Sequence, residues 1–125
     1  MFKKSSFTIS SKKYIYAKAA KIPNKQNHIM VSQDEDEITV VTNAENSAKI
    51  EIIEKNQYYW RLISLNLKIP FMPGTLAAIN SACAKKSLNN LIVSTYSKDY
   101  IIVRDDKIGE VKDVLRMLGF KEKAI

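Results

Sequence analysis

The chain has 125 residues, of which 46% are hydrophobic, and a formal net charge of +7. This length allows one compact unit, or two small halves that share a core, and excludes two independent enzymes. The longest apolar runs span only about four or five residues, which excludes a transmembrane helix, and the single cysteine, Cys83, excludes an internal disulfide.

The positive charge is concentrated at the start of the chain. Residues 1–25 hold seven lysines and no acidic residue, whereas basic and acidic residues balance in residues 26–125. Such a segment could bind nucleic acid or an anionic surface; the alternative is a solvated, lysine-rich strand. No arginine accompanies these lysines, although arginine is the preferred residue for reading bases. A nucleic-acid partner is therefore the less favoured of two hypotheses.

The N-terminal sequence also bears on location. No apolar stretch follows the basic residues Lys3 and Lys4, so we expect no signal peptide. With one cysteine and no membrane segment, the expected location is the reducing cytoplasm.

The first half of the chain predicts mainly strands. Three are expected at Tyr14–Ala19, His28–Gln33 and Ile38–Thr42, the last two joined by the acidic turn Asp34–Glu37. The segment Lys21–Asn27 contains Pro23 and is too short for a good helix. Residues 50–54 fit a helix or a strand, and we favour a strand that forms a hairpin with residues 58–67.

The second half shows clearer periodicity. Residues 58–67 alternate as in a strand, and the prolines and glycine of residues 69–74 end it. Thr75–Lys86 then predicts a helix with a small-residue face, because Leu76, Ile79 and Cys83 recur at helical spacing. A hairpin of strands at about 90–96 and 99–104 follows.

The last helix is predicted by its ends as well as by its apolar stripe. Asp105 and Asp106 suit a helix start, and Gly119 suits the left-handed position of a Schellman cap, with Phe120 folding back onto Leu115. Residues 120–125 could add a short edge strand.

These elements give the order β-α-β-β-α, with a possible final strand. That is the ferredoxin-like pattern of an α+β protein, an antiparallel sheet with two helices on one face. The first half can be interpreted as a degraded copy of the second. The expected division is an N-terminal unit of residues 1–57 packed tightly against a C-terminal unit of residues 58–125.

A polar cluster interrupts the predicted hairpin. Thr95, Tyr96 and Asp99 lie between the apolar strands Leu91–Val93 and Tyr100–Val103, and a tight reversal would bring them to one end of the hairpin. This is the chemistry that a site for a small charged ligand needs.

The second half resembles the ACT domain, in the bacterial form related to the CASTOR amino-acid sensors. The resemblance is carried by the Trp60-Arg61-Leu62 strand, the Gly74-Thr75-Leu76-Ala77 helix start, the run Ser94-Thr95-Tyr96-x-x-Asp99 with its apolar strand, and the helix that closes at Gly119-Phe120. In the first half, Asp36–Val41 is similar to a short acidic-then-apolar segment of such proteins.

The resemblance implies tandem ACT-like units, binding of a free amino acid or similar metabolite, a homodimer joined through ACT units, and no catalysis. The ligand-binding residues that it implies are Gly74, Thr95, Tyr96 and Asp99.

Physical chemistry supports this set, with an alternative for each member. A helix start at Gly74 attracts an anion, and Asp99 can pair with an ammonium group. Alternatively, Gly74 only begins the helix, Thr95 is an ordinary strand residue, Tyr96 packs in a core or dimer interface, and Asp99 caps the turn through backbone amides.

The sequence contains little that supports a metal site, a phosphate-binding loop or a catalytic site. His28 is the only histidine, the acidic turn lacks the spacing and glycine of an EF-hand, and three glycines form no phosphate loop. No base lies beside a nucleophile. We therefore expect no metal site, no cofactor and no enzymatic activity.

Overall fold

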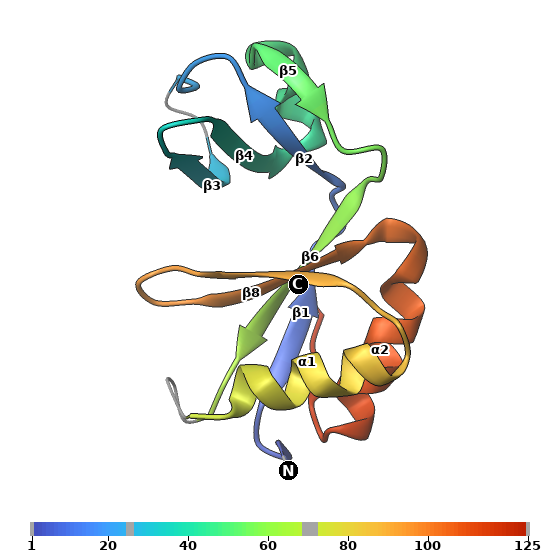
Figure 1. Cartoon of the computed structure of the whole chain (residues 1–125). Helices are drawn as coiled ribbons and strands as arrows, with labels where there is room; N and C mark the ends of the chain where they lie inside the picture. Colours follow the sequence, from blue (N-terminus) through green and yellow to red (C-terminus); the bar gives the residue numbers. More distant parts are fainter. Residues whose placement is uncertain (1, 25–26, 69–72, 125) are drawn as a thin grey trace. The chain divides into compact units, whose positions relative to one another are not determined.

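The computed structural model describes residues 2–24, 27–68 and 73–124, which form nine strands and two α-helices (Figure 1). Contacts divide the chain into two units. The first unit combines residues 1–10 with residues 61–125, and the second consists of residues 11–60. This boundary differs from the expected division into 1–57 and 58–125, because the first strand belongs with the C-terminal half.

The first unit is a sheet with two helices. Its helices are α1 (Thr75–Lys85) and α2 (Ile108–Met117), which contact each other on one face of the sheet (Figure 1). The strands run in the order β9-β1-β6-β8-β7. Their bounds are β1 Ser6–Ile9, β6 Trp60–Asn66, β7 Asn90–Ser94, β8 Asp99–Arg104 and β9 Lys121–Glu122.

Strand β1 lies between the two strands that a four-stranded ferredoxin-like sheet would place side by side. It pairs antiparallel with β6, where Phe7 faces Leu65, and parallel with β9, where Ser6 faces Lys121. The sequence analysis did not predict this strand. The short edge strand that it suggested for residues 120–125 is present as β9.

The core of the first unit lies between its helices and its sheet. Ile79 and Cys83 of α1 are buried, with Ala78 and Ala82 packed beside them, as the small-residue face of this helix predicted. Val111, Val114 and Leu115 form the buried side of α2. Ile63, Ile101 and Val103 complete this cluster from β6 and β8.

The second unit has four antiparallel strands in the order β3-β4-β2-β5. They are β2 Tyr14–Ala19, β3 His28–Gln33, β4 Ile38–Asn43 and β5 Ile52–Lys55. A 3₁₀ helix, η1 (Ala44–Lys49), connects β4 to β5, and its start is capped by the Asn43 side chain, which accepts from the Glu45 N–H at 3.0 Å. Ala19, Val40 and Ile50 form a small core.

The expected hairpin between residues 50–54 and 58–67 is wrong. Strand β5 pairs with β2 instead, and the Asn56 N–H continues this pairing by donating to the Tyr16 carbonyl at 2.8 Å. Trp60 then pairs with Tyr14 farther along the same strand. The two segments therefore follow one another along one edge of β2 and cannot face each other.

The predicted N-cap at Asp105 and Asp106 is also wrong. These residues form a 3₁₀ turn, η2 (Asp105–Lys107), and neither side chain caps α2. Arg104 donates to both carboxylate oxygens of Asp106, at 3.0 and 2.6 Å, while Asp105 accepts from Arg61 at 3.3 Å. The two carboxylates therefore bond to neighbouring arginines, and neither caps α2.

The C-terminal end of α2 has the predicted Schellman geometry. Gly119 has φ +105°, its N–H donates to the Arg116 carbonyl at 3.0 Å, and the Phe120 N–H donates to the Leu115 carbonyl at 3.0 Å. A side chain here would also meet backbone, because an added Cβ would lie 3.1 Å from the Phe2 nitrogen.

Three further expectations concern the loop after β2, the break before α1 and membrane-spanning helices. The loop after β2 contains no helix in its described residues, as predicted from Pro23; residues 25 and 26, and residues 69–72 of the predicted break before α1, lie outside the described residues. None of the helices described is both long and apolar enough to cross a membrane.

We predict that Gly119→Ala lowers the free energy of unfolding by about 2 kcal/mol, because the left-handed backbone and the nearby Phe2 backbone both oppose a Cβ. Gly109→Ala is the matched control. Gly109 lies within α2 with open space around it, so this change should stabilise by about 0.5 kcal/mol. Urea unfolding measures the change in unfolding free energy for both variants. Equal changes would contradict the assignment of Gly119 to the left-handed position of the Schellman cap.

The Asp106 carboxylate should show a pH signature. The hydrogen bond from Arg104 lowers the pKa of Asp106. The ionised Asp106 carboxylate therefore stabilises the folded chain at pH values above its unfolded pKa, about 4, and this contribution is lost as the pH falls through the lowered folded pKa. We predict that Arg104→Gln raises the Asp106 pKa toward its ordinary value in an NMR titration, while Arg116→Gln does not. An Asp106 titration that is the same in wild type and Arg104→Gln would refute the pairing.

Candidate functional site

A recess in the first unit lies between the start of α1 and the β7–β8 hairpin. It has a volume of about 300 Å³. It is lined by Leu67, Gly74, Thr75, Leu76, Ala77, Ser94 and Asp99. Two of the four residues predicted for ligand binding, Gly74 and Asp99, therefore line one recess.

The helix start supplies one side of the recess. Gly74 precedes α1 with φ +90°, a conformation that glycine adopts without strain. The first bond of the helix runs from the Ala78 N–H to the Gly74 carbonyl at 2.9 Å. The N–H groups of Thr75, Leu76 and Ala77 precede that bond, and helical geometry gives them no acceptor within the helix.

Nothing in the described first turn offsets this positive end. No side chain caps the helix, and the first turn contains no acidic residue. The aligned peptide dipoles therefore leave partial positive charge facing the recess, which favours an anionic group.

The hairpin supplies the opposite charge. Asp99 begins β8 and pairs with Ser94, the last residue of β7. The Ser94 hydroxyl donates to Asp99 Oδ1 at 2.6 Å, and the Asp99 side chain is half-buried. This bond orients the carboxylate and leaves Oδ2 to accept from a ligand.

Apolar side chains form another part of the lining. Leu67 and Leu76 are partly buried and pack against the core of the first unit. The recess therefore combines N–H donors, a carboxylate and aliphatic surface, the combination that ligand sites for small polar molecules usually have.

The other two predicted residues, Thr95 and Tyr96, do not line the recess. Thr95 is exposed and closes the turn: its N–H donates to the Lys98 carbonyl at 2.8 Å and its hydroxyl accepts from the Lys98 N–H at 3.2 Å. The Tyr96 side chain is 98% exposed, so it belongs to no core that the described residues form.

Sequence reasoning missed five of the lining residues: Leu67, Thr75, Leu76, Ala77 and Ser94. Ser94 belongs to the motif that led to the prediction, and the pairing of positions 94 and 99 in a tight hairpin was the available signal. Ala77 contributes a backbone N–H group, so its residue type carries little information about the site, whereas Leu67 and Leu76 also contribute apolar side chains that many core residues share.

The lysine-rich start of the chain is not a single free arm. Lys12 pairs with Glu45 at 3.0 Å, Lys21 pairs with Glu51 at 3.8 Å, and Lys13 lies over the Tyr59 ring. These contacts weaken the motive for the nucleic-acid hypothesis, which remains an untested prediction.

Comparison with known proteins finds similarity in structure alone. No family model matches the sequence, and no curated protein matches it either. A protein from Agrobacterium tumefaciens superimposes with a TM-score of 0.77 at 16% identity, over 97% of this chain and 93% of that one. A Vibrio cholerae protein of unknown function, described as a possible transport protein, gives 0.75 at 17% identity, over 94% and 92%.

Aspartokinase chains show the same fold at greater distance. The regulatory subunit of aspartate kinase from Thermus thermophilus matches with a TM-score of 0.57 at 10% identity, over 89% of this chain and 95% of that one. A structure of aspartokinase alpha and beta subunits gives 0.63 at 12% identity, over 90% and 95%. The fold is therefore mixed α+β and ACT-like.

Proposed function

We propose that the protein is a regulatory protein of the CASTOR-like ACT type that binds a free amino acid, or a similar small zwitterion, in the recess of the first unit. One observation carries the proposal: the start of α1 and Asp99 present opposite charges to a space of about 300 Å³. A zwitterion is the ligand whose two charges match them.

The chemistry of binding follows from the lining. The ligand carboxylate would accept from the N–H groups at the start of α1, where the helix dipole adds to the hydrogen bonds. The ammonium group would donate to Asp99 Oδ2, a charge-assisted bond. Leu67 and Leu76 would contact the ligand side chain and so bias the site toward ligands with aliphatic carbon.

The strand orders support an interpretation of both units as ferredoxin-like. If β1 is set aside, the first unit has the order β9-β6-β8-β7, and the second has β5-β2-β4-β3. When the four strands of each unit are numbered as they follow in the sequence, both sheets have the strand order 4-1-3-2. The second unit has a loop and η1 where the first has helices, and its β5 pairs directly with β2, whereas β1 separates β9 from β6 in the first unit. In this interpretation the second unit is a reduced copy with the same strand order.

Regulation would work through population shift. A ligand that binds one packing of the units, or one association of chains, more tightly than another shifts the equilibrium toward it. The homodimer that we propose would join chains at sheet edges, since β7 and β3 stand at the ends of their strand orders. In this proposal the protein acts in the cytoplasm, and it regulates a partner and catalyses no reaction.

A thermal-shift screen of the free amino acids tests the proposal. Ligand at about 100 times its dissociation constant adds about 2.7 kcal/mol, which should raise Tm by several degrees for a chain of this size. Asp99→Ala should abolish the rise, because the ammonium loses its partner. Failure of every amino acid to raise Tm would count heavily against the function.

Tyr96→Ala is the matched control from the same hairpin. Its ring is exposed and outside the recess, so the variant should keep the wild-type Tm rise. If Tyr96→Ala removed the rise and Asp99→Ala kept it, the ligand would lie at the hairpin tip and the assigned recess would be wrong.

A further inference from the structure

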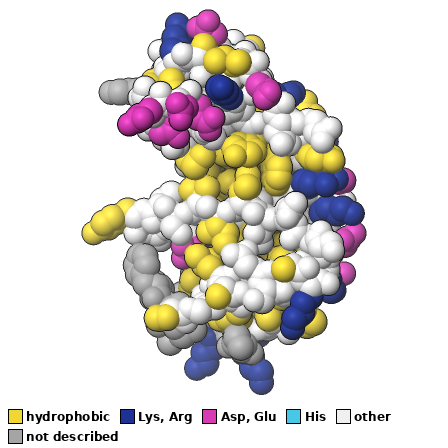
Figure 2. Space-filling model, in the orientation of Figure 1, with side chains coloured by type: hydrophobic (Ala, Val, Ile, Leu, Met, Phe, Trp, Pro, Cys, Tyr) yellow, Lys and Arg dark blue, Asp and Glu magenta, His cyan; other side chains and the backbone are white. Residues whose placement is uncertain are grey.

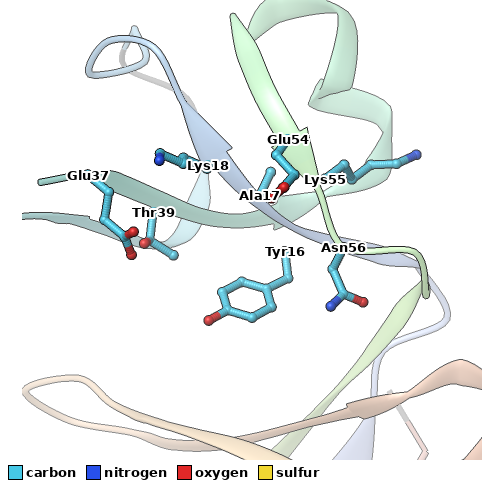
Figure 3. A pocket seen from close by; sticks show the side chains of 8 residues that line it. All are labelled: Tyr16, Ala17, Lys18, Glu37, Thr39, Glu54, Lys55 and Asn56. Atoms are coloured by element: carbon cyan, nitrogen blue, oxygen red, sulfur yellow. The ribbon is translucent and has the colours of Figure 1, made fainter.

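The second unit contains a recess of its own, with a volume of about 230 Å³ (Figure 3). All of its lining residues belong to residues 11–60, so it is distinct from the recess at α1. It lies over β2, the start of β4 and the end of β5.

Strand register explains how the recess is built. Lys18 of β2 faces Thr39 on β4 and Glu54 on β5. Residues that face each other across strands place their side chains on the same side of the sheet, and Tyr16, two positions from Lys18, joins them there. Ala19 and Val40 point to the other side, into the small core.

The charges that line this recess do not neutralise one another. Among the described residues, the side chains of Lys18, Glu37 and Glu54 make no hydrogen bond or ion pair, although Lys18 and Glu54 are direct cross-strand neighbours. Figure 3 shows the Lys18 amine and the Glu54 carboxylate pointing apart. The Lys55 amine lies over the Tyr59 ring, 5.0 Å from its centroid.

Oxygen atoms gather on one side of the recess. In Figure 3 the Tyr16 ring extends toward the side where the oxygens of Glu37 and Thr39 lie. The ring is held by an edge-on contact with Trp60, with centroids 6.2 Å apart. The recess therefore offers two hydroxyl groups and an aromatic face from side chains on β2 and β4, and a carboxylate from Glu37, just before β4.

The surroundings add negative potential. Glu37 ends the exposed acidic turn Asp34–Glu37, and Figure 2 shows Asp and Glu side chains gathered at this end of the β3–β4 hairpin. Two backbone N–H groups donate to Asp34 Oδ1, at 2.8 and 2.9 Å, and lower the pKa of Asp34. This carboxylate, which holds the turn in shape, therefore stays ionised.

We propose that this recess binds a small organic cation, a molecule whose ammonium or guanidinium groups outnumber its carboxylates. The cation would donate to the Glu37 carboxylate and to the hydroxyl oxygens of Tyr16 and Thr39, with Glu54 on the opposite flank. Charge-assisted bonds to carboxylates and attraction to an aromatic face are the interactions that select such groups. Two sources share this chemistry, a basic amino acid and a polyamine.

NMR titration of the full ¹⁵N-labelled chain tests the proposal, with arginine and putrescine as probes and glutamate as the anionic control. We expect saturable shifts of backbone amides at residues 16–18, 37–39 and 54–56 with a cation and none with glutamate. The same shifts should persist in Asp99→Ala, so failure here is distinguishable from failure of the proposed amino-acid site.

Matched variants locate the charges. Glu37→Gln and Glu54→Gln should each weaken binding about two- to fivefold, the range for an exposed ion pair. Glu35→Gln removes the same charge from the same turn but does not line this recess, so it should change the affinity less. Lys18→Gln distinguishes a polyamine from a basic amino acid. Removing the Lys18 charge should strengthen binding of a polyamine, which has only positive groups, and should weaken binding of an amino acid whose carboxylate contacts Lys18.

Several results would overturn the proposal. These are no saturable shift with either cation, equal shifts with glutamate, or an effect of Glu35→Gln as large as that of Glu37→Gln. The last result would mean that the turn attracts cations through its total charge, with no defined site.

Discussion

Pairing of β1 between β6 and β9 is the constraint on which the first unit depends. It brings residues 6–9 beside residues 63–66 and buries Phe7 completely. The same segment places Phe2 against Phe120, with ring centroids 4.8 Å apart, and lets the Phe2 N–H donate to the Leu118 carbonyl at 3.0 Å. The two ends of the chain are thereby joined within one core.

This pairing also reaches the candidate site. The Ser5 hydroxyl, just before β1, accepts from the Lys68 N–H at 3.0 Å, and Lys68 follows Leu67, which lines the recess at α1. Lys68, just after β6, is therefore anchored by the N-terminal segment. A residue that sequence analysis placed in another unit thus helps to fix one wall of the recess.

The two units use similar strand orders to present different chemistry. In the first unit, the positive side of the recess comes from backbone N–H groups and the negative side from one carboxylate held by Ser94. In the second unit, the recess is lined by side chains on the face of the sheet, including two carboxylates that no described residue pairs with. We therefore propose a zwitterion for the first recess and a cation for the second.

Local periodicity predicted most elements of this fold, because it reports which side of an element is buried. The strands at residues 14–19 and 28–33 were predicted with their observed bounds, and α1 and the Gly119 cap were close to their observed form. Strand β1 was missed because Ser6–Ile9 is short, and its burial depends on partners more than 50 residues away in sequence. The pairing of β5 was wrong for a similar reason: composition does not say which edge of β2 is free.

The site was predictable in part for a physical reason. Gly74 and Asp99 have functions tied to residue type, a left-handed helix start and a negative charge. Thr95 and Tyr96 belong to the same motif, but the direction of a hairpin side chain depends on the register, which places 94 opposite 99 and leaves 95–98 to the turn. Ser94, which the register brings to Asp99, was therefore the better candidate.

A crystal structure of the full chain with the amino acid that gives the largest Tm rise tests the central claim most directly. The account predicts the ligand carboxylate within hydrogen-bonding distance of the Leu76 or Ala77 N–H, and its ammonium group at Asp99. An amino acid bound elsewhere, with the space between Gly74 and Asp99 holding only solvent, would contradict it.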